Sequence, residues 1–267
     1  MEQLTRVSRV FYALALIVYG AQQFVYGNFR NVQLPPWQNH FPLLPVWAYI
    51  TGLGLVAAGV CIILNKRARK VSLITGGVFF AFLCIFHIPY ELISEPNKSY
   101  HLGLWTGALK ELALSGGAFI LAGSYIKTGT VIQGKSILLQ LMTKLVPFGH
   151  IFFSITMVSF GIAHFMYIDF IDKLVPDWVP DPIFWTYFAA VALIGSGTCI
   201  ILDIQRKKIA LLLGVMILLW VFTLHIPRAF ANPTGERGNE LSSVFDALAF
   251  TGTAFMIALG QPGKKDE

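Results

Sequence analysis

The sequence predicts an all-α, polytopic membrane protein with eight transmembrane helices, arranged as two tandem four-helix bundles related by a pseudo-twofold axis along the membrane normal. Three observations lead to this fold class. First, 55% of the 267 residues are hydrophobic and only 13% are charged, which is too apolar for a soluble domain of this length. Second, apolar runs long enough to cross a bilayer recur eight times. Third, several motifs occur twice at a nearly constant spacing, as in a duplicated chain.

Each of the eight apolar runs has close to the length of about 20 residues that a helix needs to cross a bilayer. A soluble helical bundle with a large core is the alternative, but short charged loops between eight such runs argue against it. The first run has no small-residue cleavage site, so we expect it to be retained as a helix. The runs cover residues 10–27, 46–64, 71–89, 104–122, 147–167, 184–202, 209–227 and 244–260.

Lysine and arginine are concentrated in alternate loops, and the other loops hold most of the acidic residues. The basic segments include NKRARK at 65–70 and QRKK at 205–208. Short loops rich in these cations stay in the cytoplasm. We therefore expect a multi-pass protein of the cell (inner) membrane, surrounded by the lipid bilayer, with both termini cytoplasmic. The same distribution accounts for the net charge of +6 without a nucleic-acid partner.

The two halves of the chain repeat the same motifs. His-Ile-Pro at 87–89 recurs 138 residues later at 225–227, and SGGAFILA at 115–122 matches TGTAFMIA at 251–258. Because each half contains four spans, both enter and leave on the same side, which gives an axis along the membrane normal and not an inverted repeat. We predict a first four-helix unit at 1–126, a cytoplasmic linker at 127–146 and a second four-helix unit at 147–267.

Two further segments carry a resemblance to a known family. GIAHF at 161–165, followed by VPDWVPDP at 175–182, resembles the DoxX-like family of small four-helix membrane proteins. The resemblance covers nearly the whole chain as two tandem units, and the first unit has GAQQF at 20–24, with Gln23 in the place of His164. Members of this family are linked to thiosulfate–quinone oxidoreductases and membrane redox complexes, and distant relatives resemble chaperones or cargo receptors. The resemblance thus implies the fold, and either a redox or an assembly function.

Proline within an apolar run disrupts a helix, because it lacks an N–H group and clashes with the carbonyl four residues back. We expect both helices to kink or stop at Ile88 and Ile226, which places His87 and His225 in their last turn on the outer side. Two roles are open for these histidines. Each could hydrogen-bond the freed helix carbonyls, or act as a ligand or proton-relay group that faces a cavity.

Charged residues at membrane depth carry the next signal. Lys110 lies about 9 Å below the outer end of its helix, at about 1.5 Å per residue, and Asp246 is its counterpart in the second unit. An unpaired charge at that depth costs several kcal/mol, so we expect these two to pair, as a structural lock or as part of a site. Glu111 has no charged counterpart. Glu91 would lie one turn beyond His87 if that helix continues.

The polar residues differ between the two units, which favours one composite, outward-facing pocket over two identical sites. Its candidate residues are His87, Glu91, Lys110, Glu111, His164, His225, Arg228 and Asp246. Histidines with carboxylates can bind a metal, but their spacing here matches no metal-binding motif, so no metal site is expected.

Standard motifs are missing from the sequence. There is no HExxH, phosphate-binding loop, GxSxG or dinucleotide fingerprint, and Cys61, Cys84 and Cys199 form no CxxC pair. We therefore expect no intrinsic cofactor.

Two classes of function follow from these observations. The first is the membrane subunit of a quinone-linked oxidoreductase system, which would bind a quinone and act with a partner redox protein. The second is a non-enzymatic protein that binds a lipid or assists the assembly of other membrane proteins. A third, more distant class is an isomerase that uses Glu and His on a sterol- or isoprenoid-like substrate. Enzymatic and non-enzymatic classes are both open at this point.

Overall fold

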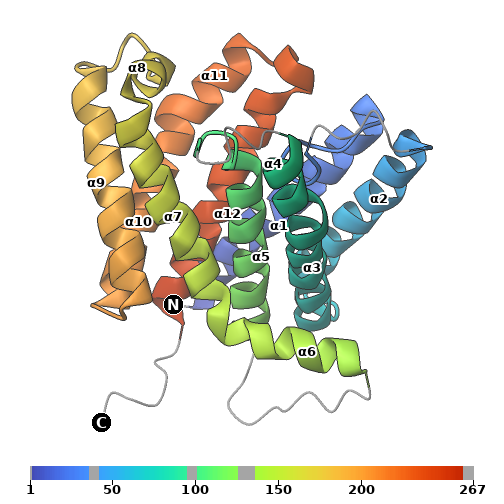
Figure 1. The fold of residues 1–267 in the computed structure, drawn as a ribbon. Coiled ribbons are helices and arrows are strands. Elements are labelled where there is room, and N and C mark those ends of the chain that lie inside the picture. Colours follow the sequence, from blue (N-terminus) through green and yellow to red (C-terminus); the bar gives the residue numbers. More distant parts are fainter. Residues whose placement is uncertain (1, 36–41, 95–100, 126–135, 261–267) are drawn as a thin grey trace.

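The computed structural model describes residues 2–35, 42–94, 101–125 and 136–260, which form helices and loops without a β-strand. The long helices lie side by side (Figure 1). By length and composition, seven helices in the described residues can cross a membrane. The prediction of an all-helical fold is confirmed, and these helices indicate a multi-pass membrane protein. They are Glu2–Tyr26, Leu44–Ile63, Ala68–Ile93, Ile137–Met166, Pro182–Ile201, Arg206–Ala231 and Gly235–Leu259.

The helices of the two halves follow one another in the same order. The first half contains α1 (Glu2–Tyr26), α2 (Leu44–Ile63), α3 (Ala68–Phe82), α4 (Ile88–Ser94) and α5 (Thr106–Gly123). The second half contains α7 (Gly149–Met166), α8 (Ile168–Ile171), α9 (Pro182–Ile201), α10 (Arg206–Trp220), α11 (Ile226–Ala231) and α12 (Asn239–Leu259). Of the predicted linker, residues 127–135 lie outside the described residues, and the rest contains α6 (Ile137–Leu145).

Helix α5 corresponds to the one predicted span that is not among the seven. Its 18 residues include the adjacent Lys110 and Glu111, which lower its mean hydropathy. Yet α5 is enclosed by other helices, because it packs against α3, α7 and α12. A helix that faces protein on most sides has no need to be apolar all round. Its polar residues therefore explain why α5 differs from its neighbours, and eight spans stay a prediction.

Neighbouring helices follow one another around the bundle in a closed order: α1, α2, α3, α5, α7, α9, α10, α12 and back to α1. In addition, α5 and α12 contact each other. The last long helix of each half thus packs against the first helix of the other half, α5 on α7 and α12 on α1. The halves therefore interlock through α5 on α7, α12 on α1 and α5 on α12; the sequence predicted two tandem four-helix bundles and did not predict which helices join them.

Corresponding helices in the two halves have matching bounds. From α2 to α9, the first residue moves from 44 to 182 and the last from 63 to 201, a shift of 138 at both ends. The pair α3 and α10 has the same shift, from 68 to 206 and from 82 to 220. The residues that precede these helices are left-handed in both halves, Leu43 and Asp181 before the first pair, Arg67 and Gln205 before the second.

Glycine allows close contacts between the halves at corresponding positions. A Cβ atom added to Gly116 on α5 would lie 2.5 Å from the carbonyl oxygen of Gly149 on α7. One added to Gly252 on α12 would lie 2.5 Å from the carbonyl oxygen of Ser8 on α1. Both distances exclude a side chain, so glycine at these positions lets the helix backbones approach each other.

Both His-Ile-Pro motifs lie within continuous helices. A π-helical turn, Leu83–His87, joins α3 to α4, and another, Val221–His225, joins α10 to α11. The amide of Ile88 donates to the carbonyl of Leu83, which is five residues back instead of four. The wider turn accommodates the ring of Pro89, which would clash with a carbonyl in a regular α-helix.

The two helices continue beyond these turns as α4 and α11, to Ser94 and Ala231. The expectation that His87 and His225 occupy the last helical turn is therefore wrong. The physical reason is that an inserted residue relieves the proline clash at the cost of one widened turn, and the helix then resumes. Glu91 consequently lies one turn after His87, as expected for a helix that continues.

The two ends of the bundle are distinguished by the helices that lie there. Helix α1 begins and α12 finishes at the same end, and α6 lies across it (Figure 1). The short helices α4, α8 and α11 lie at the opposite end, which we call the far end (Figure 1). Most of the sequence-predicted site residues lie on the parts of the helices close to this far end.

Candidate functional site

A mainly apolar cavity lies between α7, α9, α10 and α12. It has a volume of 340 Å³, and we call it the histidine cavity because His164 and His225 both line it. Apolar side chains form most of its lining, including Phe160, Trp220 and Phe250. This volume lies within the range of about 300–1,000 Å³ that is typical of small-molecule sites, which also combine an apolar lining with a few polar groups.

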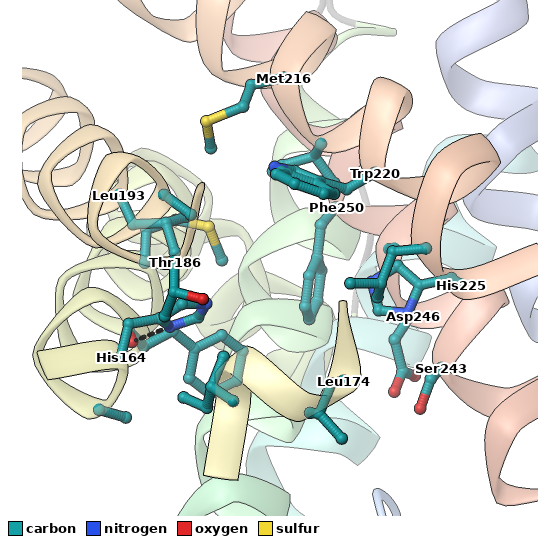
Figure 2. Close-up of a pocket in the computed structure, with 18 of the residues that line it drawn as sticks. His164, Leu174, Thr186, Leu193, Met216, Trp220, His225, Ser243, Asp246 and Phe250 are labelled. Carbon is teal, nitrogen blue, oxygen red and sulfur yellow. Dashed lines mark hydrogen bonds between the residues drawn. The ribbon is translucent and has the colours of Figure 1, made fainter. Parts of the chain in front are cut away.

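The polar groups of the histidine cavity gather on two sides. Figure 2 shows His225, Ser243 and Asp246 together on one side, and His164 with Thr186 on the other. Trp220 and Phe250 lie between these groups (Figure 2). The cavity therefore offers an apolar space with polar groups at each edge.

His164 lies in the last turn of α7, where its ring is fixed by a backbone contact. Its Nδ1 lies 2.7 Å from the carbonyl oxygen of Phe160. A carbonyl only accepts, so Nδ1 carries the proton and donates, and Nε2 of the neutral ring is an acceptor. Thr186 is also oriented by its own helix, because its hydroxyl donates to the carbonyl of Pro182 at 2.9 Å.

Lys110 and Asp246 form the predicted ion pair. Lys110 Nζ lies 2.8 Å from Asp246 Oδ2, and the side chain of Asp246 is only 4% exposed. The hydroxyl of Tyr19 donates to the other carboxylate oxygen, Oδ1. Both oxygens of this buried carboxylate are therefore satisfied, which a charged group requires in an apolar surrounding.

A second cavity lies on the other side of this ion pair. It has a volume of 250 Å³, and we call it the polar cavity because Arg30, His87 and Glu91 line it. Lys110 and Asp246 line both cavities, so their ion pair forms part of the wall between them. The sequence predicted one composite pocket flanked by His87 and His225. The structure instead places these histidines in two cavities that share a wall.

His87 is fully buried and lies between the helices and the loop that follows α1. Within the described residues, neither ring nitrogen has a hydrogen-bond partner at normal geometry, although the backbone of Val32 and Gln33 lies close by. Gly107 of α5 leaves room for the ring, because a Cβ added there would lie 3.2 Å from His87 Cε1. Among the described residues, no acceptor lies within hydrogen-bond geometry of either ring nitrogen of His87, so the capping role is not observed for this histidine.

Arg30 completes the polar cavity and was missed by the sequence analysis. It is 2% exposed, its Nε donates to Ser242 Oγ at 3.1 Å, and its guanidinium lies over the ring of Tyr26. Burial lowers the pKa of this guanidinium from its ordinary value, while Tyr26 and Asp246 oppose that shift. A basic residue in a loop on the acid-rich side was the signal that could have identified it.

Two predicted site residues line neither cavity. Glu111 on α5 is fully buried, and its two carboxyl oxygens have no hydrogen-bond partner among the described residues. Arg228 on α11 instead forms a two-point contact with Glu240, with Nη2 2.5 Å from Oε1 and Nε 3.0 Å from Oε2. Of the eight candidates, the structure thus brings six into the walls of two adjoining cavities.

The arrangement can hold and orient a small amphipathic molecule. In the described part of the chain, no group of three or more His, Cys, Asp or Glu side chains is placed to hold a metal ion. Donors and acceptors are nevertheless available, because the Lys110 ammonium has three N–H groups and Nε2 of His164 is an acceptor. In comparisons with protein-family models, curated proteins and solved structures, no match to this chain was found.

Proposed function

We propose that this protein is the membrane subunit of a quinone-linked oxidoreductase system and binds a quinone-class molecule in the histidine cavity. The observation that carries the proposal is the placement of polar groups at two opposite sides of an apolar space. A quinone has flat apolar faces and one oxygen at each of two opposite edges. It therefore matches a cavity in which Trp220 and Phe250 lie between Asp246 on one side and His164 on the other (Figure 2). Lys110 is ion-paired with Asp246 and lines the same cavity.

The residues of the cavity have defined parts in this proposal. The quinol hydroxyl on one edge donates to Nε2 of His164, and the oxygen on the other edge accepts from the Lys110 ammonium. Oxidation of the quinol releases two electrons and two protons. His164 and Asp246 are the groups that receive the protons, and the electrons pass to the partner redox protein. The Tyr19 hydroxyl holds the Asp246 carboxylate in place.

The proposal includes an architecture with eight spans, in two units related by a pseudo-twofold axis along the membrane normal. Three features support it: α5 is enclosed in the bundle, corresponding helices have matching bounds, and α5 on α7 corresponds to α12 on α1. The DoxX-like resemblance of GIAHF and VPDWVPDP supports the same architecture. Basic residues at the starts of α3 and α10 favour a cytoplasmic location for the end of the bundle where these helices begin. The far end, with its cavities, then faces outward.

Quinone binding can be tested by the fluorescence of the two tryptophans that line the histidine cavity, Trp185 and Trp220. Decylubiquinone is expected to quench the fluorescence of the purified protein with saturation. Most of that quenching should disappear in the Trp185→Phe/Trp220→Phe variant. Trp47→Phe is the matched control, because Trp47 has the corresponding place on α2 and lies outside the cavity.

A second variant tests the polar edge of the cavity. His164→Leu removes the acceptor, so affinity for decylubiquinol is expected to fall about tenfold, as for the loss of one hydrogen bond. Equal quinol affinity in His164→Leu and the unmodified protein would refute the proposal, and so would quenching without saturation.

A non-enzymatic lipid-binding or assembly function is the second candidate. It is favoured by the mainly apolar lining of the histidine cavity. In addition, Cys61, Cys84 and Cys199 are all free and form no redox-active disulfide. A native mass spectrum of the gently extracted protein distinguishes the two functions. A co-purified quinone supports the redox proposal, and a phospholipid or a client protein without quinone supports the second candidate.

A further inference from the structure

A third cavity lies in the first half of the chain, between α1, α2 and α3. It has a volume of 380 Å³, and we call it the side cavity. It shares no lining residue with the histidine cavity, but several of its residues hold the corresponding places in the other half. Leu55 and Phe82 line the side cavity, and Leu193 and Trp220, 138 residues later, line the histidine cavity. The two halves therefore enclose related spaces.

The chemistry of the side cavity differs from that of the histidine cavity, because none of the described residues that line it is charged. Gln23 takes the place of His164, and its amide joins a short network. Thr51 Oγ1 donates to Gln23 Oε1 at 2.9 Å, and Gln23 Nε2 donates to Gln33 Oε1. Gln33 then has its Nε2 group left over.

This amide group of Gln33 is the polar feature that points to a ligand. Gln33 lines the side cavity and is 1% exposed, and its buried Nε2 has no hydrogen-bond partner among the described residues. A buried donor without an acceptor is unfavourable, and the large majority of such groups in folded proteins are paired. A ligand oxygen that accepts a hydrogen bond would satisfy it.

The side cavity is long and opens on the outside of the bundle. On α2 it extends from Thr51 to Cys61, about 15 Å at 1.5 Å per residue, which is half of the roughly 30 Å hydrocarbon core. Gly54 has no atom within 4 Å of an added Cβ, and Ile74 and Val78 across the opening are both more than 40% exposed. In a membrane protein this opening faces lipid, so its occupant enters from the bilayer.

From these observations we infer that the side cavity is a second binding site, which takes a neutral single-chain lipid with one carbonyl or ester oxygen. The oxygen accepts from Gln33 Nε2, and the chain extends along α2 toward Cys61. Among the described lining residues, Cys61 is the only one with a titratable side chain, so the inferred role is to hold the lipid and not to transform it. This inference depends on the membrane location of the protein and is independent of quinone binding in the histidine cavity.

Cys61 provides a direct readout, because it lines the inner part of the side cavity and is a free thiol. In full-length protein with Cys84→Ala and Cys199→Ala, in nanodiscs, methyl oleate is expected to slow the reaction of Cys61 with N-ethylmaleimide at least fivefold, with saturation. The matched control keeps Cys199 and replaces the other two cysteines. Cys199 has the corresponding place on α9 but does not line the histidine cavity, so it should not be protected.

The role of Gln33 is tested by a pair of ligands and a substitution. 1-Octadecene has a similar chain without an oxygen, so it should protect Cys61 about tenfold more weakly than methyl oleate. In Gln33→Leu this difference should disappear. Equal protection by the two ligands in the unmodified Cys61 protein would overturn the assignment of Gln33.

The location of the site is tested by filling its opening. Gly54→Leu is expected to abolish protection of Cys61, and the open space around this position allows the larger side chain. Gly195 on α9 is the matched control, because it is equally open and lies outside the cavities. Gly195→Leu should leave protection intact, and decylubiquinone quenching should be normal in both variants. Failure of methyl oleate to protect Cys61, or equal effects of the two substitutions, would refute the second site whatever the result for quinone.

Discussion

Asp246 is the residue on which both neighbouring cavities depend. One of its carboxylate oxygens pairs with Lys110 and the other accepts from Tyr19, so residues from α1, α5 and α12 meet at one buried group. Breaking a buried ion pair by removing one partner leaves an uncompensated charge, which is more destabilising than replacing both partners.

We therefore expect strong coupling between Lys110 and Asp246. Lys110→Met alone should lower the free energy of unfolding by about 3–5 kcal/mol, and Lys110→Met/Asp246→Asn should lower it by less. A double-mutant cycle with reversible denaturation in detergent measures this difference. The more exposed pair Arg228 and Glu240 is the control and should show weaker coupling. Additive losses at Lys110 and Asp246 would contradict the buried pair.

Glu111 should behave in the opposite way, because no partner for its carboxyl group is found among the described residues. A buried carboxylate without a partner is unfavourable because of its charge. If Glu111 is charged, a neutral amide of the same shape removes that penalty. Glu111→Gln is therefore expected to keep or raise the thermal unfolding midpoint, by about 2–4 °C for each kcal/mol gained. Asp246→Asn is the comparison and should lower the midpoint. The prediction fails if the two substitutions destabilise the protein equally.

At the residue scale, the sequence predicts part of the candidate site. Lys110 and Asp246 could be paired in advance because they hold corresponding places and carry opposite charges. His164 could be found because it replaces a glutamine of the other half. Gln33 could not, because its role depends on a loop that folds back onto α1, and no local pattern specifies that contact. Arg30 is marked only by its charge on the acid-rich side, and its contact with Ser242 on α12 depends on the same loop.

The π-helical turns are the element-scale feature with the clearest consequence. One extra residue in the turn rotates everything that follows by about 100° relative to a regular helix. In the first half this rotation helps to set the direction in which Glu91 points. The proline therefore acts on the polar cavity through the helix, although Pro89 is not one of the residues that line it.

Pro89→Ala restores an amide and allows a regular α-helix, so it is expected to rotate Glu91 away from the polar cavity. Glu91 is 5% exposed, and a cysteine at its position in a cysteine-free background should react slowly with a hydrophilic maleimide. Adding Pro89→Ala should increase that rate severalfold. Pro227→Ala, at the corresponding place in the other half, should leave the rate unchanged. An unchanged rate in Pro89→Ala would show that the proline does not set the π-helical turn.

At the element scale, hydrophobic runs predict the long helices well because lipid and core both select apolar residues over about 20 positions. The π-helical turns could not be predicted in this way. The local rule for proline allows a kink, a stop or a widened turn, and no local pattern decides among the three.

At the scale of the whole molecule, the position of α5 decides the topology. With α5 as a span, the chain crosses the membrane eight times and both termini share one side. Without it, the second half is inverted and the termini lie on opposite sides. The interlocked packing of α5 on α7 and of α12 on α1 favours the first arrangement.

Reporter fusions distinguish these topologies. Green fluorescent protein fused after Gly260 is expected to fluoresce, as it does only in the cytoplasm. Alkaline phosphatase inserted between Asp177 and Trp178 is expected to be active outside. An alkaline phosphatase fusion in the α9–α10 loop, after Asp203, is the matched control and should be inactive. Phosphatase activity after Gly260 would exclude eight spans.

The sequence predicts the global repeat from motif spacing, but it does not predict how the halves interlock. Spacing reports that two segments resemble each other and carries no information on which surfaces meet. Gly116 and Gly252 allow close packing of helices. Their partners, Gly149 and Ser8, lie in the other half of the chain and are identified only by the three-dimensional contacts.

Because the Lys110–Asp246 ion pair forms part of the wall between the two cavities, we expect binding in one cavity to be coupled to binding in the other. A ligand in the histidine cavity that draws the Lys110 ammonium toward itself leaves more of the negative charge of Asp246 facing the polar cavity. A cation that settles in the polar cavity then binds more tightly, and reciprocity requires that the same cation increases the affinity for that ligand by the same factor. Occupancy on one side of the wall is in this way communicated to the other without any movement of the helices.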